Sequence, residues 1–345
     1  MKRLGVIILN WNGLKLLKEF IPTVAATTIS ADIDLVVADN GSTDGSCEWL
    51  EENFPQVRLL RFDRNYGFAG GYNRALAKTR YPLTILLNSD VMTTQGWAET
   101  LLRYMDAHPE VGACQPKLRS YREPEKFEYA GAMGGLIDAL GYPYCYGRLF
   151  NCVETDKGQY DSPEDRDVAW ASGAALMVRT DIYLDLGGLD EAFFAHMEEI
   201  DLCLRIWRAG YRITAVPSAV VYHVGGASLD ASNPQKTYLN FRNNLLLLHK
   251  NMPLSSASIS PSSIVKPLSS SKPLLVKRRL LDTLSWAMFM AKFRFGHANA
   301  ILRAHRDFRR MKGKYKRLPK EDIYFDLPGT ERHIVFDRFL LGKKK

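Results

Sequence analysis

Short apolar runs alternate with helical patterns between Leu4 and Pro116 of this 345-residue chain. Runs typical of buried strands occur at Leu4–Leu9, Asp34–Ala38, Val57–Phe62, Leu83–Leu87 and Val111–Pro116. The segments between them have apolar residues at helical spacing, at Leu14–Ala25, Cys47–Asn53, Ala69–Thr79 and Trp97–Met105. This alternation predicts an α/β fold with a mostly parallel central sheet and helices on both faces.

Apolar runs return later in the chain. We expect further strands at Ala174–Val178, Arg212–Val216 and Ala219–Tyr222, and helices at about Glu199–Ala209 and Thr237–Lys250. The intervening stretch, Ser120–Arg166, is rich in glycine, tyrosine, proline and charge, and we interpret it as long loops beside the site.

The composition predicts three segments. Residues 1–253 form the α/β domain, residues 254–273 form a linker rich in serine and proline, and residues 274–345 form a basic helical extension. That extension holds 19 lysines and arginines against seven acidic residues, whereas the whole chain carries a net charge of +8, so the rest of the chain is net acidic. The imbalance points to an acidic partner for this segment alone.

Residues 275–311 of the extension have helical character in two pieces that break near Gly296. An apolar stripe is expected along these pieces, at Leu281, Leu284, Met288, Phe295, Ala298 and Leu302. A cationic amphipathic helix of this kind can lie on an anionic membrane surface without spanning it. The alternative is a helical pair packed on the first domain with a solvated basic face. No nucleic-acid-binding motif is present, so no nucleic-acid partner is expected.

The five cysteines are scattered, odd in number and free of C-x-x-C pairs, which favours a reducing compartment. The opening apolar run, Leu4–Leu9, is too short for a signal peptide, and no stretch reaches the roughly 18 apolar residues that span a bilayer. We expect a cytoplasmic protein that is peripheral on the inner face of the cytoplasmic membrane. The sequence does not indicate an oligomeric state.

Small polar residues gather where four of the predicted strands end or turn. They include Asn10-Trp11-Asn12-Gly13, Asp39 to Ser46, Asn65 to Asn73, and Asn88-Ser89-Asp90. Ligands bind at the carboxyl edge of an open α/β sheet. For a bound nucleotide, Trp11 could supply an apolar wall for the base, Asp39 an acceptor for an imide N–H, and Gly70-Gly71 close backbone approach. The alternative interpretations are an Asx-turn with a helix cap and a tight strand-to-helix turn.

Two further groups of residues point to chemistry. Asp90 at a strand end could hold Mg²⁺ or Mn²⁺, and His223, which ends an apolar run, is an acceptable Mn²⁺ ligand. Glu198, Glu199 and Asp201 place three carboxylates at a helix start, where one could act as a general base. The alternatives are acidic residues that favour the helix dipole and an Asp201–Arg205 pair.

These motifs, in this order, resemble family 2 glycosyltransferases, which have the GT-A fold, and in particular their bacterial rhamnosyltransferase-like branch. The resemblance covers about residues 2–252 and rests on six motifs: Leu9 to Gly13, Asp39 to Ser46, Asn65 to Asn73, Asn88 to Asp90, Phe193-Phe194 with Glu198 to Cys203, and Tyr222-His223. It implies inverting transfer of a sugar, rhamnose being one candidate, from a UDP- or dTDP-linked donor.

The resemblance also implies roles for individual residues. The donor nucleotide would be contacted by Asn10, Trp11, Asp39, Asn40, Asn65, Gly70, Gly71, Asn73 and Asn88. Asp90 would hold the metal with His223 as second ligand. Glu199 matches the position of the general base, with Glu198 or Asp201 as alternatives.

The expected acceptor is a saccharide, lipid-linked in view of the basic extension, in cell-surface polysaccharide synthesis. Two other enzyme classes fit poorly. A nucleotidyltransferase needs a basic glycine-rich loop after the first strand, and a nicotinamide dehydrogenase needs G-x-G-x-x-G there. A non-catalytic nucleotide-sugar-binding partner subunit is the alternative that remains.

Overall fold

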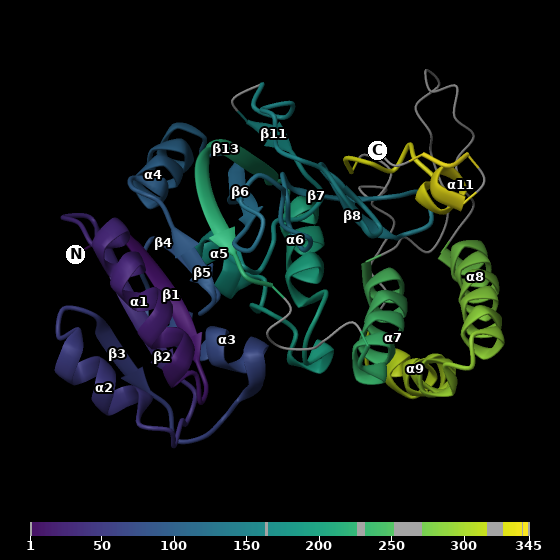
Figure 1. The fold of residues 1–345 in the computed structure, drawn as a ribbon, viewed down its shortest axis with the longest axis horizontal. Helices are drawn as coiled ribbons and strands as arrows, with labels where there is room; N and C mark the ends of the chain where they lie inside the picture. Colours follow the sequence, from purple (N-terminus) through teal and green to yellow (C-terminus); the bar gives the residue numbers. More distant parts are fainter. Residues whose placement is uncertain are drawn as a thin grey trace.

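The computed structural model describes residues 2–162, 165–225, 232–251, 271–315, 327–339 and 341–343. Nine strands form its central sheet (Figure 1): β1 (Leu4–Asn10), β2 (Ile33–Asp39), β3 (Arg58–Arg61), β4 (Leu83–Leu87), β5 (Val91–Thr93), β6 (Val111–Ser120), β11 (Arg166–Asp167), β12 (Ala175–Arg179) and β13 (Arg212–His223). Their order is β11-β13-β6-β12-β4-β1-β2-β3, and β5 also pairs with β13.

The sheet is mixed but mostly parallel, as the alternation predicted. β1 pairs in parallel with β2 and β4, β2 with β3, and β6 with β13, whereas β12 runs antiparallel between β4 and β6. The helices that cover it are α1 (Leu14–Thr28), α2 (Ser46–Asn53), α3 (Gly67–Thr79), α4 (Trp97–Ala107), α5 (Thr180–Asp185) and α6 (Glu198–Arg208). They lie on both faces of the sheet and enclose two separate apolar cores.

The stretch expected as loops, Ser120–Arg166, contains a second sheet. Its four short strands are β7 (Gly135–Ile137), β8 (Pro143–Cys145), β9 (Arg148–Leu149) and β10 (Cys152–Val153), in the order β10-β9-β8-β7. Strands of two or three residues are too short to show the alternation that identifies a strand in a sequence. The expectation of loops was wrong here.

The two runs expected as separate strands, Arg212–Val216 and Ala219–Tyr222, form one strand, β13, which keeps pairing with β6 through a register shift between Val216 and Val220. Pro217 lies within that shift, where a missing backbone N–H is tolerated. Because β13 is continuous, it delivers His223 to the same edge of the sheet as β4 and β5.

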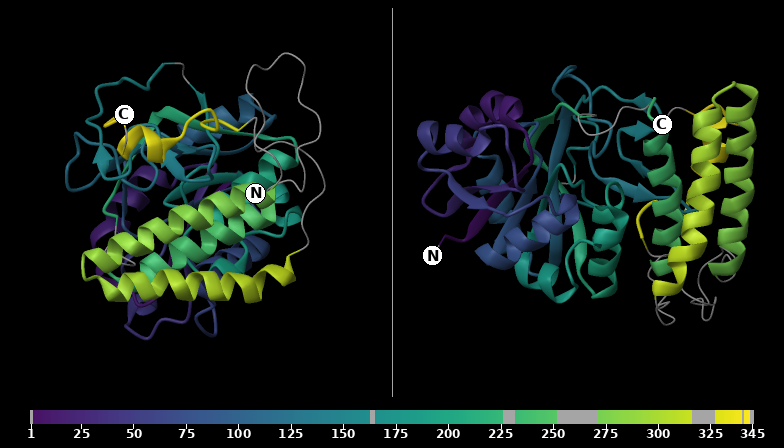
Figure 2. Two further views of the ribbon diagram at one scale, coloured as in Figure 1. Left: turned by 90° about the vertical axis from the view of Figure 1, so that its right-hand side faces the viewer. Right: turned by 90° about the horizontal axis from the view of Figure 1, so that it is seen from below.

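Three long helices lie beside one another at one end of the molecule (Figure 2): α7 (Pro234–Asn251), α8 (Ser271–Ala291) and α9 (Phe295–Met311). A 3-10 turn, η2 (Lys312–Lys314), follows α9, and the chain returns to the small sheet at α11 (Ile334–Phe339). There the backbone N–H of Ile334 donates to Asp138 at 3.0 Å. The predicted linker, 254–273, lies mostly outside the described residues.

The predicted break in the basic helices is close to the observed one, between Ala291 and Phe295. The predicted stripe does not form a single face. Ala298 is buried and Leu281 packs against the core, whereas the other four members are exposed. None of the described helices is long and apolar enough to cross a membrane.

Candidate active site

The ends of β1 and β2 are joined by Asp39 and Asn10, which are both buried. Asp39 Oδ1 accepts from the backbone N–H groups of Gly41 (3.2 Å) and Ser42 (2.9 Å), and Oδ2 accepts from Asn10 Nδ2 at 2.9 Å. The pair therefore shapes the loop after β2. A carboxylate oxygen can accept more than one hydrogen bond, so a contact from Asp39 to a nucleobase stays a prediction.

Asn40 connects that loop to the start of α3. Its Nδ2 donates to Asn65 Oδ1 at 2.9 Å and to Gly67 O at 3.0 Å, and its Oδ1 accepts from Tyr66 N at 3.0 Å. Asn40 is buried, and both polar atoms of its side chain are hydrogen-bonded within the protein, whereas Asn65 is exposed. Trp11 follows β1 and is also exposed, so an aromatic surface is available at this edge.

Gly71 is required by packing, and Gly70 is less constrained. A Cβ added at Gly71 would lie 2.6 Å from Leu9 Cδ1, so the missing side chain lets α3 pack on β1. A Cβ at Gly70 would lie 3.2 Å from the carboxyl group of Glu191, which is at the end of an exposed side chain. Close approach of Gly70 to a ligand stays a prediction.

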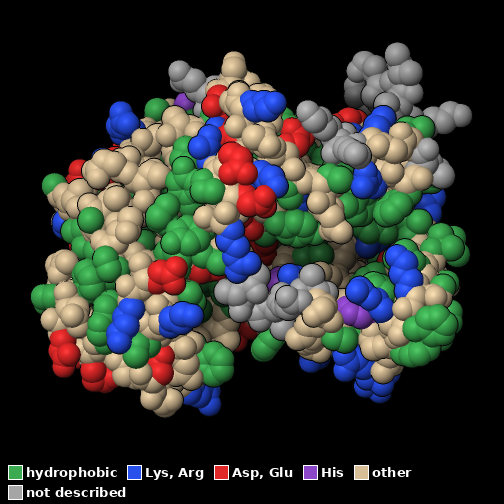
Figure 3. Space-filling model, viewed as in Figure 1, with side chains coloured by type: hydrophobic (Ala, Val, Ile, Leu, Met, Phe, Trp, Pro, Cys, Tyr) green, Lys and Arg blue, Asp and Glu red, His purple; other side chains and the backbone are tan. Residues whose placement is uncertain are grey.

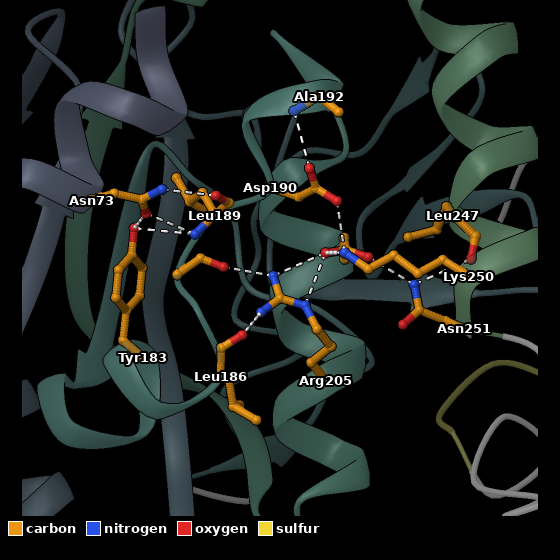
Figure 4. A network of polar contacts seen from close by, with 12 residues as sticks. Asn73, Tyr183, Leu186, Leu189, Asp190, Ala192, Arg205, Leu247, Lys250 and Asn251 are labelled. Atoms are coloured by element: carbon orange, nitrogen blue, oxygen red, sulfur yellow. Dashed lines mark hydrogen bonds and ion pairs between the residues drawn. The ribbon is translucent and has the colours of Figure 1, made fainter. Parts of the chain in front are cut away.

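Asn73 joins α3 to the segment after α5 (Figure 4). Its Nδ2 donates to Leu189 O at 2.9 Å, and its Oδ1 accepts from Leu189 N at 2.9 Å and from the Tyr183 hydroxyl at 2.6 Å. These three hydrogen bonds hold the segment after α5 against α3. The amide has a second N–H, so a contact of Asn73 with a nucleotide stays a prediction.

The triplet after β4 meets the end of β13. Asp90 Oδ1 lies 3.1 Å from His223 Nε2, and Asn88 Nδ2 lies 3.4 Å from the same nitrogen. Burial would raise the pKa of Asp90, but the hydrogen bond and charge of His223 hold it below its ordinary value. Burial opposes the imidazolium, yet the hydrogen bonds and charges of Asp90 and Glu128 raise the pKa of His223 to about 10.

Glu128 was not identified from the sequence. It lies in the Gly- and Tyr-rich stretch, is buried, and places Oε1 3.5 Å from His223 Nδ1. Its Oε2 accepts from Ala130 N at 2.6 Å. No local pattern marks this residue, because its partner is distant in the sequence and its burial depends on the second sheet.

Two side chains of this group suit a divalent cation. The 3.1 Å between Asp90 Oδ1 and His223 Nε2 is a hydrogen bond, so a cation held by both residues would take the place of the Nε2 proton. Glu128 faces the other ring nitrogen and cannot join them. Among the described residues no group of three or more potential ligand side chains occurs, so a cation here needs oxygen atoms from a phosphate group or water.

Glu198 and Glu199 begin α6 and point into the protein. One oxygen of each, Oε2, is buried without a hydrogen-bond partner among the described residues. Burial raises the pKa of Glu199 to about 7. Burial and the neighbouring Glu199 raise the pKa of Glu198 well above its ordinary value. The pKa of each carboxyl group is raised, so one of this pair can accept a proton near neutral pH, as a general base must.

Glu199 lies next to the loop that begins α3. A Cβ added at Gly173 would lie 3.7 Å from Glu199 Cβ and 3.9 Å from Phe68 Cζ. Phe68 belongs to the Asn65–Asn73 segment, so the proposed base and the predicted donor loop adjoin. Nearby, burial lowers the pKa of His196 to about 4, which keeps this imidazole neutral.

Asp201 is occupied by a buried network (Figure 4). Its Oδ2 accepts from Arg205 Nε at 2.9 Å and from Lys250 Nζ at 2.8 Å, and its Oδ1 accepts from Asn251 Nδ2 at 2.9 Å. Both oxygens of this carboxylate are taken by side chains of α6 and α7. Asp201 connects α6 to α7, and we no longer consider it a candidate base.

The chain is similar to known glycosyltransferases. The family model described as "Glycosyl transferase family 2" matches residues 5–162. The N-acetylglucosaminyl-diphospho-decaprenol L-rhamnosyltransferase of Mycobacterium tuberculosis is 29% identical over 238 residues, which are 64% of this chain and 75% of that protein. The low-salt glycan biosynthesis hexosyltransferase Agl10 of Haloferax volcanii is 23% identical over 256 residues, or 70% and 74% of the two chains.

Solved structures share the fold. The mannosyltransferase PcManGT from Pyrobaculum calidifontis, in complex with GDP-Man and Mn²⁺, superposes with a TM-score of 0.51 at 16% identity, over 90% of this chain and 84% of that one. GalNAc-T7 with UDP, GalNAc and Mn²⁺ gives a TM-score of 0.56 at 15% identity, over 72% of this chain and 48% of that one. The neighbours place this sheet and its flanking helices among GT-A-like folds.

Proposed function

Because the chain belongs to glycosyl transferase family 2 and is a glycosyltransferase that uses a nucleotide-sugar donor, we propose that it transfers the sugar with inversion in a reaction that needs Mg²⁺ or Mn²⁺. The observation that supports this most is the position of Glu199. It lies beside Phe68 of the predicted donor loop, while Asp90 and His223 meet at the ends of neighbouring strands.

In this proposal Asp90 and His223 hold the cation, assisted by Asn88. A bound cation supplies positive charge that stabilises the departing diphosphate. Trp11, Asp39 and Asn65 contact the donor nucleotide. Glu199 takes the proton of the acceptor hydroxyl, and the freed oxygen attacks the anomeric carbon from the face opposite the diphosphate. The C–O bond to the diphosphate breaks as the new glycosidic bond forms, so one displacement inverts the carbon.

We propose a UDP- or dTDP-linked sugar, with rhamnose as first candidate, and a lipid-linked saccharide acceptor in polysaccharide synthesis. The support is the relative's name, which gives L-rhamnose as the sugar and N-acetylglucosaminyl-diphospho-decaprenol as the acceptor. The catalytic part would be residues 1–253, joined by the 254–273 linker to the basic extension, 274–345.

The extension offers a surface for a lipid-linked acceptor at a membrane. Val276, Leu280, Leu284 and Met288 recur every four residues on α8 and are 55%, 63%, 66% and 45% exposed. We call this set the α8 ridge. Residues 274–311 contain nine lysines and arginines against two aspartates, and Figure 3 shows apolar and basic side chains together over the end of the molecule that holds α8 and α9.

An anionic lipid surface fits the α8 ridge better than a second copy of the chain. A second copy would bring Lys277, Arg279, Lys292 and Arg294 against the same cations, which repel. Apolar insertion with basic flanks is the pattern of interfacial helices. We therefore propose peripheral attachment to the inner face of the cytoplasmic membrane.

A donor and acceptor screen tests the catalytic proposal. The full chain is incubated with UDP- and dTDP-sugars, including dTDP-L-rhamnose, and with N-acetylglucosaminyl-diphospho-decaprenol, in Mg²⁺, Mn²⁺ or EDTA. We expect metal-dependent transfer that Asp90→Ala abolishes, and a product with inverted anomeric configuration by NMR. A retained configuration would contradict the mechanism, and a lack of turnover with every donor would favour the non-catalytic partner subunit.

A further inference from the structure

Three of the four residues before α6 have a strained backbone. Phe194 has φ 67° and ψ −59°, and Ala195 N donates to Phe193 O at 2.8 Å, which together define a classic γ-turn, a rare and strained conformation. His196 and Met197 follow with φ values of 68° and 73°. Positive φ is unusual for bulky side chains and persists only where the surroundings enforce it.

Two buried side chains of α7 hold the backbone of this turn in its strained conformation. Asn243 Nδ2 lies within hydrogen-bonding distance of three carbonyl oxygens of the turn, those of Phe193 (2.9 Å), Ala195 (2.8 Å) and His196 (2.7 Å). Arg242 Nη2 donates to Phe193 O at 2.7 Å and to Ala192 O at 3.1 Å. Arg242 Nε also donates to Asn243 Oδ1 at 2.9 Å, which fixes the amide with its NH₂ toward the turn.

The turn directly precedes the proposed base. Met197 is the N-cap of α6, and its carbonyl accepts from Asp201 N at 2.9 Å, so the path of the turn sets the direction of the helix start that bears Glu199. On its other side, Glu191 accepts from Arg74 of α3 at 3.3 Å. The turn is therefore connected to α3 on one side and to the helix start that bears Glu199 on the other.

The Phe194 side chain is 63% exposed. Burial would ordinarily stabilise a phenylalanine and offset the strain of its backbone, and here most of that stabilisation is absent. An aromatic ring held out by a strained turn beside a proposed base is explained better by a ligand than by folding.

We propose that Arg242 and Asn243 are positioning residues that hold this turn so that Glu199 faces the acceptor hydroxyl, and that Phe194 presents its ring to the saccharide acceptor. The apolar C–H face of a sugar ring packs on such an aromatic surface. This inference rests on the proposed function. It adds that α7, outside the central sheet, controls the acceptor side of the reaction.

Hydrogen exchange of the free full-length protein tests the positioning role without any substrate. Asn243→Ala should speed exchange of the amides from Phe193 to Ile200 at least tenfold. The matched control is Asn244→Ala, because Asn244 is the next residue of α7, is equally buried, and donates to Gly141 O at 2.8 Å instead. It should leave those amides unchanged. Equal exchange in the two variants would overturn the positioning role.

Kinetics with dTDP-L-rhamnose and N-acetylglucosaminyl-diphospho-decaprenol test the link to transfer. Asn243→Ala should lower kcat at least tenfold while the Kd for UDP and dTDP changes less than twofold. A loss of nucleotide affinity together with kcat would indicate general unfolding and contradict a specific role. If the wild-type protein fails to transfer with this pair, the substrate assignment fails, and the exchange experiment still decides the positioning role.

Phe194→Gly distinguishes the effect of backbone strain from the effect of the aromatic ring. The variant loses the ring, while glycine adopts positive φ without strain. We expect an unchanged or higher Tm together with at least a tenfold higher KM for N-acetylglucosaminyl-diphospho-decaprenol and an unchanged KM for the donor. Phe194→Ala should raise the same KM and have a lower Tm than Phe194→Gly, because alanine keeps the strain that glycine relieves. A wild-type acceptor KM in the glycine variant would overturn the contact.

Discussion

His223 Nε2 lies 3.1 Å from Asp90 Oδ1, although the two residues are 133 positions apart in the chain. Glu128 faces the opposite nitrogen of the same ring at 3.5 Å. A carboxylate that accepts from Nδ1–H would orient the ring with Nε2 toward a cation. The structure thus supplies two proposed ligands and an outer partner.

Glu128→Ala is expected to weaken Mn²⁺ binding about 10–100-fold, as is typical when the outer partner of a ligating histidine is lost. Glu128→Gln keeps an acceptor oxygen for Nδ1–H, so this variant should lose less Mn²⁺ affinity than Glu128→Ala. Isothermal titration of Mn²⁺ in the presence of UDP measures the effect. Glu123→Ala, at an exposed acidic residue of the same stretch, is the control. Wild-type affinity in Glu128→Ala would show that Glu128 does not orient the ring.

The pH dependence of transfer should report the buried pair at the start of α6. Since Glu199 must be ionised to accept a proton and its pKa is raised to about 7, the rate should rise with pH through about 7 and then level off. Glu199→Gln should lower kcat about 100-fold or more. Glu198→Gln should keep most of the activity, because a protonated Glu198 is already neutral. The reverse pattern would make Glu198 the base.

The same pair has a consequence for stability. A carboxyl group whose pKa is raised in the folded state binds more protons there than in the unfolded chain, so stability falls as pH rises from about 4.3, the unperturbed value, through about 7. Urea unfolding of Glu198→Gln at pH 6 and pH 8 should therefore show a smaller decline than the wild type. An identical decline would indicate that Glu198 is not perturbed.

The strands and helices of the first half could be predicted because their signal is local. Leu83–Leu87 is the observed β4 residue for residue, since every position is buried and apolar or β-branched. Because the end of this strand could be predicted, Asn88 and Asp90 could be identified as residues at the edge of the sheet. His223 and the three carboxylates at the start of α6 were identified from the residues themselves, and the family resemblance then favoured Glu199 among the three.

Other features of the fold and of the site depend on contacts between residues that are distant in the sequence, so no local sequence pattern predicts them. Asn73 looks like a pocket residue, yet its partner, Leu189, is 116 positions away. Glu128 and Asn243 act through distant backbone and ring atoms. The second sheet has strands too short for a pattern. In each case the tertiary partner, not the neighbouring sequence, determines the role.

Replacing Asp201 should cost stability. The carboxylate is fully buried between Arg205 and Lys250, and removing one partner of a buried ion pair leaves the others uncompensated. Asp201→Ala is expected to lower the free energy of unfolding by about 3 kcal/mol or more. Urea denaturation measures it, with Glu51→Ala as control, because the Arg61–Glu51 pair is exposed and should contribute less than about 1 kcal/mol. Equal losses would refute a structural role for Asp201.

The α8 ridge should bind vesicles that contain phosphatidylglycerol. Leu280→Ser with Leu284→Ser is expected to weaken binding at least tenfold in a flotation assay, because burial of one leucine contributes about 1.5–3 kcal/mol. Lys292→Glu with Arg294→Glu should also weaken it, and raised salt should weaken wild-type binding through screening.

The charge control is Lys15→Glu with Lys18→Glu on α1, which changes the net charge equally at the far end of the molecule from α8. If this control weakens vesicle binding as much as the change at Lys292 and Arg294, the attraction is a property of the whole molecule and not of the α8 ridge. A stable dimer in sedimentation that Leu280→Ser with Leu284→Ser dissociates would instead assign the ridge to a second copy of the chain. A monomer with binding lost only in the α8 variants is the expected result, because the cations that flank the ridge repel a second copy and attract an anionic surface.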